Sequence, residues 1–521
     1  MAVGSLLTVS EVVRSHARVR PAKVAARDSR RALRYSEWND RASRLAHGLL
    51  GTGLHKGDRV AVLAYNCVEW MELYVALARA GLIAVPINFR LVGPEIQYIA
   101  QHCEIRAFVV QESLVSAGGP ICDQLHLPER RLIHFGDGVA PSGWSSYESL
   151  IEESSAGDVA EAAGPEDVWA LMYTSGTTGR PKGVIRNHGA TSMMSLVLAV
   201  EIGFTTSDTA LLVMPMCHAN SLYFSFAFAY LGATCVIEDH AEFDPDNVLR
   251  MLSEQAITFT SLVPTHYIMI LGLLEETKRR RDLSHVRNLM ISSAPARRDT
   301  KLAIMEHFTN SGLHEVYGST EAGFVTHLRP DEQLTKIGSV GRELIGSAPI
   351  QLVDAHGVEV PDGDVGELVS RTPYTFDGYW KDPDQTAQAL RGEWCSVGDL
   401  ARRDDDGFIY LVDRKHNMII RGGSNIYPTE VENLLGAHPA VKDVAVIGIP
   451  DDHWGEAVHA VVVRHQGSDV TEADILAWCE DRIAAYKRPA SVTFLTDADM
   501  PRTLSGKILH RTLRDRWSTT T

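Results

Sequence analysis

The chain lacks several features that mark particular classes of protein. Its seven cysteines are scattered and include no C-x-x-C pair, which argues against a disulfide framework and against the common zinc-binding patterns. No apolar run approaches the roughly 18 residues that a membrane-spanning helix needs. The first residues have no basic segment followed by an apolar core, so we expect no secretory signal peptide and a reducing, cytoplasmic location.

Positive charge is also in deficit. The 521 residues include 50 Lys and Arg against 66 Asp and Glu, which gives a formal net charge of −16. Such an excess of negative charge disfavours nucleic acid and anionic membranes as main partners. A polyanionic ligand must therefore be bound by local basic groups. The hydrophobic content of 45% is typical of a soluble globular protein.

Apolar runs alternate with helical segments along most of the chain. The runs 60–64, 83–86 and 106–110 have the pattern of buried strands, and amphipathic segments separate them. A second series of the same kind covers residues 210–310. This alternation predicts an α/β fold with parallel, helix-covered sheets. The segment 111–164 has a weaker pattern.

The pattern changes towards the C-terminus. Between residues 338 and 412, short β runs separated by Asp, Gly and Pro turns predict a small β-barrel or sheet. The residues beyond this segment contain helices and strands of their own and are numerous enough for a compact domain. We therefore expect a large N-terminal domain, residues 1–413, and a smaller α+β domain, residues 414–521.

One segment, Tyr173-Thr-Ser-Gly-Thr-Thr-Gly-Arg-Pro-Lys-Gly183, concentrates hydrogen-bond donors after a predicted buried strand. Glycines let backbone N–H groups approach an anion, hydroxyl groups add donors, and Lys182 adds a point charge. The segment therefore predicts a phosphate-binding loop. It is not a Walker A loop, because its glycines are too close together and a proline precedes the lysine.

The loop resembles the nucleotide-binding motif of the adenylate-forming superfamily, which contains acyl-CoA synthetases, luciferases and the adenylation domains of peptide synthetases. Five further motifs follow in the order typical of that superfamily, and the last of them ends at Lys507. The roles described next are those that this resemblance implies.

The next motif is similar to the one that binds adenine, phosphate and metal. In Tyr317-Gly-Ser-Thr-Glu-Ala-Gly323, the resemblance implies that Tyr317 stacks on adenine, that Thr320 bonds the phosphate, and that Glu321 binds Mg²⁺. This ion takes few protein carboxylates and keeps phosphate oxygens and water as ligands. Upstream, Ser292-Ser-Ala-Pro295 matches an adenine-contacting loop that is usually richer in glycine.

Two motifs resemble those that bind the ribose. Glu393-Trp-Cys-Ser-Val-Gly-Asp399 ends in Asp399, which would accept hydrogen bonds from both ribose hydroxyls, since a carboxylate only accepts and has two oxygens. Asp413-Arg-Lys415 contains Arg414, which would contact ribose and phosphate. The superfamily hinge, usually Asp or Lys, follows this arginine. Here His416 takes its place, so the identity of the hinge residue stays open.

The last two motifs imply a second reaction step and a moving domain. The loop Ile420-Arg-Gly-Gly-Ser-Asn-Ile-Tyr-Pro-Thr-Glu430 would line the pantetheine tunnel through Gly422 and Gly423, with Asn425 near the nucleotide. Lys507, in Pro-Arg-Thr-Leu-Ser-Gly-Lys, resembles the catalytic lysine that bridges the substrate carboxylate and the α-phosphate. A mobile small domain would present the lysine in one step and the glycine loop in the other.

The resemblance implies an acyl-CoA synthetase that uses ATP, Mg²⁺ and CoA. A carboxylic acid would be converted to acyl-AMP with release of pyrophosphate, and the acyl group would then pass to the thiol of CoA. The residues implied in cofactor binding are Thr174, Ser175, Gly176, Thr177, Thr178, Gly179, Lys182, Ser293, Ala294, Pro295, Tyr317, Gly318, Ser319, Thr320, Asp399, Arg414, Gly422, Gly423 and Asn425. The implied catalytic residues are Lys182, Glu321 and Lys507, and the implied metal ligands are Glu321 and Thr178.

The acid itself is not specified. The resemblance places His218 beside the acyl pocket, and Asn220 and Tyr223 are further candidates for its wall. For the aromatic residues of the helix that follows, we expect packing in the hydrophobic core rather than contact with a ligand. A polar, an aryl and an aliphatic acid are all compatible with these residues.

Three alternatives stay open. The acyl group could pass to a separate carrier protein, the chain could be an inactive nucleotide-binding relative, or it could act as a luciferase-like oxidase. No carrier domain is recognised on the chain, which favours free CoA. The intact Lys182, Glu321, Asp399, Arg414 and Lys507 argue against an inactive relative. The composition allows a homodimer without indicating one.

Overall fold

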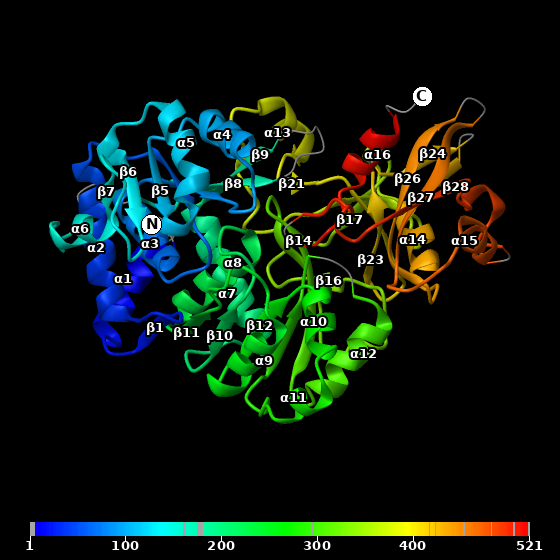
Figure 1. Ribbon diagram of the computed structural model, residues 1–521, viewed down its shortest axis with the longest axis horizontal. Coiled ribbons are helices and arrows are strands. Elements are labelled where there is room, and N and C mark those ends of the chain that lie inside the picture. Colours follow the sequence, from blue (N-terminus) through cyan, green and yellow to red (C-terminus); the bar gives the residue numbers. More distant parts are fainter. Residues whose placement is uncertain are drawn as a thin grey trace. The chain divides into compact units, whose positions relative to one another are not determined.

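The structure, a computed structural model, describes residues 6–159, 163–174, 181–293, 296–415, 417–421, 424–451, 454–480, 482–503 and 506–518. The chain forms two compact units (Figure 1). The first contains Met1–Pro349 and Ser370–Cys395, and the second contains Ile350–Val369 and Ser396–Thr521. No helix in the described part of the chain is long and apolar enough to cross a membrane.

One mixed sheet of the first unit contains β1 (Val24–Arg27), β2 (Ala32–Arg34), β10 (Thr209–Leu212), β11 (Thr234–Ile237), β12 (Phe259–Leu262), β13 (Asn288–Ile291), β14 (Gly312–Ser319), β15 (Gly323–Leu328) and β16 (Arg342–Glu343). Its nine strands have the order β16-β15-β14-β13-β12-β10-β11-β1-β2. The strands from β14 to β1 are parallel, and β15, β16 and β2 add antiparallel edges.

The other large sheet contains β3 (Arg59–Leu63), β4 (Ile83–Ile87), β5 (Ala107–Gln111), β6 (Leu132–Phe135), β7 (Ser145–Ser146), β8 (Val168–Thr174), β9 (Lys182–Asn187) and β19 (Gly378–Tyr379). Its eight strands have the order β19-β9-β8-β4-β3-β5-β6-β7. The strands from β8 to β7 are parallel, whereas β9 and β19 run antiparallel to their neighbours. A short hairpin, β20 (Leu390–Arg391) and β21 (Trp394–Cys395), completes the strands of this unit.

The helices of the first unit are α1 (Val9–Val19), α2 (Tyr35–Gly51), α3 (Glu69–Ala80), α4 (Gly93–His102), η1 (Glu112–Leu114), α5 (Val115–Leu125), η2 (Glu129–Arg131), α6 (Tyr147–Glu152), α7 (His188–Ile202), α8 (Ala219–Leu231), α9 (Pro245–Glu254), α10 (Pro264–Leu271), α11 (Glu275–Arg279), α12 (Arg298–His307) and α13 (Pro383–Ala389). Several begin at capping residues that satisfy free backbone N–H groups. Asn187 caps α7 and Asp244 caps α9, where a proline occupies the first turn.

Helix α8 lies between the two large sheets (Figure 1). Its Phe226 ring contacts Trp169 of β8 at a centroid distance of 4.9 Å, and its Phe224 ring contacts Phe259 of β12 at 4.7 Å. A helix that is apolar on all sides is typical of the interior. The aromatic residues Tyr223, Phe224, Phe226 and Phe228 of this helix are buried, as the sequence favoured, whereas Tyr230 is partly exposed.

The second unit contains two smaller sheets. An antiparallel sheet has the order β17-β18-β22-β23, and a second has the order β25-β24-β27-β26 with β28 parallel to β27. The strands are β17 (Gln351–Val353), β18 (Gly366–Val369), β22 (Asp399–Arg403), β23 (Ile409–Arg414), β24 (Ile419–Arg421), β25 (Ser424–Ile426), β26 (Val441–Asp451), β27 (Gly455–Arg464) and β28 (Ser491–Leu495). The helices are α14 (Pro428–Gly436), α15 (Glu472–Trp478), η3 (Ala485–Lys487) and α16 (His510–Ser518).

The predicted α/β fold is confirmed. The sequence predicted a small β-barrel or sheet for residues 338–412, and these residues contribute the antiparallel sheet β17-β18-β22-β23. The strands of this segment divide between the units, because β16, β19 and the β20–β21 hairpin belong to the first. The weakly patterned segment 111–164 contains α5, β6, β7 and α6, which the sequence did not predict. The predicted boundary between residues 413 and 414 separates a stationary domain from a mobile one, whereas the two units described above are defined by compactness. The predicted boundary therefore stays a prediction.

A buried ion pair joins α12 to β14. Lys301 and Glu315 contact each other with 1% and 5% of their side chains exposed. Burial raises the pKa of Glu315, and the Lys301 ammonium lowers it in part. Because Glu315 precedes Tyr317 by two positions on β14, the pair helps to fix the strand that presents the predicted adenine-binding residue.

Lys301→Met should lower the free energy of unfolding of the first unit by about 3–5 kcal/mol, because the buried Glu315 carboxylate would lose its partner. Urea unfolding followed by tryptophan fluorescence would measure the change. The double variant K301M/E315L should recover most of the loss, since an apolar pair can replace a buried ion pair at little cost. A double variant no more stable than K301M would contradict this account.

Candidate active site

The two ends of the predicted phosphate loop lie side by side. Thr174 is the last residue of β8 and Lys182 is the first of β9, and the two are paired across these antiparallel strands. The predicted site residues Ser175, Gly176, Thr177, Thr178, Gly179, Ala294, Pro295, Gly422 and Gly423, together with the hinge candidate His416, lie outside the described residues. The predicted loop therefore connects two paired strand ends, at the carboxyl end of β8.

Four neighbouring parallel strands, β10, β12, β13 and β14, end at one edge of the nine-stranded sheet. The segments that follow them contain many of the predicted residues. His218 and Asn220 follow β10, Ser293 follows β13, and Tyr317 and Glu321 lie at and just beyond the end of β14. Open α/β sheets bind their ligands at this carboxyl edge. The topology thus gathers the predicted acyl and adenine residues into one region.

The predicted acyl residues are mostly buried. The side-chain amide of Asn220 bonds Ser261 Oγ at 3.0 Å and Ser292 Oγ at 2.6 Å, and all three residues are buried. His218 precedes α8, and burial lowers its pKa, so its imidazole is neutral at physiological pH. Tyr223 is only 2% exposed, so its role as a pocket residue stays a prediction.

The backbone at this edge has a left-handed residue, Ser293, and a closely packed glycine, Gly318. Ser293 has a φ of +69°, a left-handed conformation that non-glycine residues seldom adopt and that is enriched at functional sites. At Gly318, an added Cβ would lie 2.1 Å from the carbonyl oxygen of Gly323. Only glycine therefore fits between Tyr317 and the predicted phosphate and metal residues of this turn.

Glu321 and Lys182 are connected through Tyr379. The Tyr379 hydroxyl donates to Glu321 Oε1 at 2.9 Å, and Lys182 Nζ lies 4.8 Å from the centroid of the Tyr379 ring. Glu321 is 9% exposed and Tyr379 is 8% exposed. Burial lowers the pKa of Lys182, while the Glu321 carboxylate raises it. Burial and the same carboxylate raise the pKa of Tyr379, which stays a neutral phenol.

Arg186 supports the same turn from β9. Its side chain is fully buried, and its Nη1 donates to the carbonyl oxygens of Thr320 at 3.4 Å and Glu321 at 3.2 Å. Its guanidinium also lies 5.7 Å from the centroid of the Tyr223 ring. Within the described residues, its Nε and Nη2 have no hydrogen-bond partner. Arg186 thus fixes the backbone of the predicted phosphate and metal motif.

The sequence did not reveal the contributions of Arg186 and Tyr379. A basic residue directly after the apolar pair Val184 and Ile185 was a usable signal for Arg186, since buried charges need a specific reason. Tyr379 gave no comparable signal. Its position depends on the pairing of β19 with β9, two strands that are remote in sequence.

In the second unit, Asp399 and Arg414 lie opposite each other on β22 and β23. Arg414 Nε and Asp399 Oδ1 form an ion pair at 3.1 Å. Lys507 is exposed, yet the protein packed around it and the Arg414 guanidinium lower its pKa to about 8, while Asp399 and Asp413 raise it. The three predicted residues therefore lie within electrostatic range of one another. Asn425 is exposed on β25.

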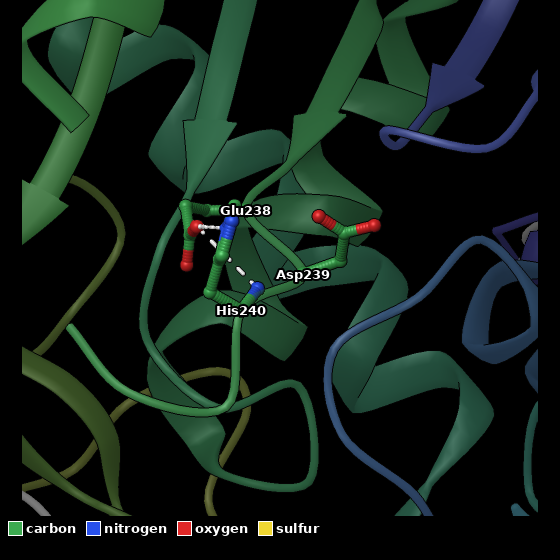
Figure 2. A group of neighbouring side chains, drawn as sticks. All are labelled: Glu238, Asp239 and His240. Carbon is green, nitrogen blue, oxygen red and sulfur yellow. Dashed lines mark hydrogen bonds and ion pairs between the residues drawn. The ribbon is translucent and has the colours of Figure 1, made fainter. Parts of the chain in front are cut away.

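A separate cluster follows β11. His240 Nδ1 lies 2.5 Å from Glu238 Oε1, and Asn247 donates to the same oxygen at 3.0 Å. Asp239 points away from the other two in Figure 2 and accepts from the Ser29 hydroxyl at 2.6 Å. These contacts account for the cluster as a hydrogen-bonded connection between β11 and α9.

Comparisons with known proteins agree with this arrangement. The family described as AMP-binding enzyme matches residues 13–380, and the AMP-binding enzyme C-terminal domain matches residues 430–507. The chain is 37% identical to a feruloyl-CoA synthase of an Amycolatopsis species over 96% of this chain and 97% of that one. It is 34% identical to an indoleacetate–CoA ligase of Aromatoleum aromaticum over 96% of each.

Solved structures show the same similarity. The crystal structure of ATP-bound MatB from Rhodopseudomonas palustris has a TM-score of 0.86 and 30% identity, over 98% of this chain and 99% of that one. The anthranilate CoA ligase AuaEII in complex with anthranoyl-AMP has a TM-score of 0.88 and 27% identity, over 99% of this chain and 98% of that one.

The fold and the residues gathered at the carboxyl edge of the nine-stranded sheet define an adenylate-forming enzyme. The chain belongs to the AMP-binding enzyme family. It is an acid–thiol ligase of the AMP-forming type that uses ATP and CoA, which confirms the resemblance found in the sequence.

Arg186→Met should raise the KM for ATP by about 10-fold, because the backbone of Thr320 and Glu321 would lose hydrogen bonds to a charged donor. Initial rates of pyrophosphate release against ATP concentration would measure this. Arg186→Lys retains the charge and should lose less. An unchanged KM for ATP together with a lower melting temperature would mean that Arg186 only stabilises the fold.

Proposed function

We propose that this enzyme activates an aromatic carboxylic acid and transfers the acyl group to CoA. The observation that carries the adenylation chemistry is the arrangement of Lys182 and Glu321 on either side of Tyr379, beside the carboxyl edge of the sheet. The choice of an aromatic acid is supported by relatives named for feruloyl-CoA, indoleacetate and anthranilate.

In the first step, the substrate carboxylate attacks the α-phosphorus of ATP. A P–O bond to the acyl oxygen forms, the bond to the bridging oxygen breaks, and pyrophosphate leaves. Two anions must approach each other, so the main obstacle is charge. Lys182 would hold the phosphates, and Lys507 would bind both the carboxylate and the α-phosphate. Asp399 would orient the nucleotide through its ribose hydroxyls.

Glu321 fits the requirements of an Mg²⁺ ligand. Its Oε1 accepts a hydrogen bond from Tyr379, and this bond does not occupy its second oxygen, Oε2. When bound, Mg²⁺ would neutralise phosphate charge and keep phosphate oxygens and water as its other ligands. Thr178 is the second proposed ligand.

In the second step, the thiolate of CoA attacks the acyl carbonyl, a C–S bond forms, and AMP leaves with the electrons of the broken C–O bond. We propose that the C-terminal domain beyond residue 413 moves between the steps, so that Lys507 serves the first and the loop with Gly422 and Gly423 serves the second. A cytoplasmic location is supported by the seven cysteines, which are all buried and form no disulfide in the described part of the chain.

A carrier-protein thiol is the second candidate acceptor. The chain is 31% identical to ScoC of Streptomyces coeruleorubidus, a fatty acid–[acyl-carrier-protein] ligase, over 98% of this chain. The deciding experiment is a panel of aromatic and aliphatic acids, scored by pyrophosphate release and by mass spectrometry of acyl-CoA. Acyl-AMP without acyl-CoA would favour the carrier protein, and aliphatic acids outperforming aromatic ones would contradict the proposed substrate class.

Lys507→Ala should slow the formation of acyl-AMP by a factor of about 10²–10³, because one charge contact to the reacting groups is lost. Thioester formation from supplied acyl-AMP and CoA should change far less. Single-turnover assays of each step would measure the two effects. Equal losses in both steps would contradict separate roles for Lys507 and the glycine loop.

The pH dependence of adenylation should report the lowered pKa of Lys507. The ammonium is the active form, so the single-turnover rate should be full below this pKa and fall above it. We expect the midpoint between about 8 and the ordinary value of 10.5. Lys507→Arg should remove this fall, because a guanidinium stays charged throughout the range. An identical alkaline limb in both proteins would assign the titration to another group.

A further inference from the structure

Tyr379 occupies an unusual position between two opposite charges. Its hydroxyl bonds the Glu321 carboxylate at 2.9 Å, and its ring face lies 4.8 Å from the Lys182 ammonium. We propose that Tyr379 is a positioning residue that keeps Lys182 and Glu321 close together but prevents them from forming an ion pair. This inference rests on the proposed roles of Lys182 in phosphate binding and of Glu321 in metal binding.

The need for such a residue follows from the ligands. Lys182 has to bind an anion and Glu321 a cation, so each must keep its charge available. Two opposite charges that share a partly buried site attract each other strongly and would otherwise pair. Within the described residues, Lys182 forms no ion pair, although its pKa, which burial lowers, is raised in part by the charges of the Glu321 and Asp382 carboxylates. Binding of the triphosphate and its metal then requires no ion pair to be broken.

The ring face and the hydroxyl of Tyr379 are both suited to keeping the two charges apart. A ring face attracts an ammonium without neutralising it, because the ring carries no net charge. The hydroxyl donates one hydrogen bond to Glu321 Oε1 and leaves Oε2 for another ligand. A phenylalanine would provide only the first of these contacts, and an aliphatic side chain would provide neither.

The backbone of Tyr379 is held on both sides. β19 pairs with β9, with Tyr379 opposite Val184, so the tyrosine is fixed to the strand that begins with Lys182. The N–H of Phe376 donates to the carbonyl oxygen of Glu321 at 2.8 Å, which connects the same segment to the metal motif. The tyrosine is therefore anchored to both of the charged residues that it separates.

The residue before the tyrosine is also constrained. Gly378 has a φ of +138°, and an added Cβ would lie 2.8 Å from Thr386 Cγ2. Thr386 Oγ1 in turn accepts from the N–H of Tyr379 at 2.9 Å. Glycine at position 378 allows α13 to approach closely and hold the tyrosine backbone in place.

The first test removes only the hydroxyl. Tyr379→Phe should weaken Mn²⁺ binding to the enzyme–ATP complex by about 10-fold, as measured by electron paramagnetic resonance, because the carboxylate loses an orienting hydrogen bond. ATP binding in EDTA, measured by calorimetry, should stay unchanged. Tyr374→Phe is the matched control, since it also loses a buried hydroxyl bond, to the Phe324 carbonyl, at 2.7 Å. Equal Mn²⁺ affinities in the two variants would overturn the proposal.

The second test allows the ion pair to form. Tyr379→Leu should weaken metal-free ATP binding by about 10-fold or more, because Lys182 would pair with Glu321. Adding Glu321→Gln should restore most of this loss, since the competing charge is then removed. No recovery in the double variant would overturn the proposal.

A separate measurement tests the proposed function itself. Wild-type enzyme should form acyl-AMP, and Lys182→Ala should lose ATP binding. If the wild type failed to form acyl-AMP, the proposed function would be wrong, whatever the Tyr379 variants show. If the wild type succeeds while the Tyr379 variants behave as their controls, only the positioning role is wrong.

Discussion

The site depends on keeping opposite charges close together without letting them neutralise each other. Lys182 begins a strand of one large sheet, and Glu321 lies in the turn between two strands of the other. Lys182 contacts the ring face of Tyr379, and Glu321 contacts its hydroxyl. The chain has a net charge of −16, so the overall field does not favour a triphosphate. Binding of a triphosphate would therefore depend on a few basic side chains held in place locally, such as Lys182, that are not already paired with carboxylates.

The two-sheet architecture of the first unit makes this arrangement possible. Helix α8 fills the space between the sheets with aromatic side chains, and its first turn carries Asn220 at the carboxyl edge. The edge strand β19 pairs with β9 and so brings Tyr379 to Lys182, and the buried guanidinium of Arg186 fixes the turn that carries Glu321. Packing of the core and placement of the charged residues thus depend on the same strands.

The second unit contains its own group of charged residues. Asp399 and Arg414 lie opposite each other on neighbouring strands, and both influence the pKa of Lys507. An ion pair holds the first two in a defined geometry. A fixed carboxylate suits the recognition of a diol, because it accepts hydrogen bonds through two oxygens.

The sequence by itself determined the α/β class and the family, and it supplied the charged and glycine residues whose roles in the site stay predictions. Glycines, hydroxyls and lone lysines in a fixed order are chemical features of short segments, and strands buried on both faces form continuous apolar runs. It could not predict the elements of segment 111–164, where β7 has two residues and α5 contains a proline. Only the tertiary structure decided that β19 joins β9, that Tyr379 lies between Lys182 and Glu321, and that Arg186 supports the predicted metal motif. These facts depend on strand pairing between segments remote in sequence, and local patterns do not encode that pairing.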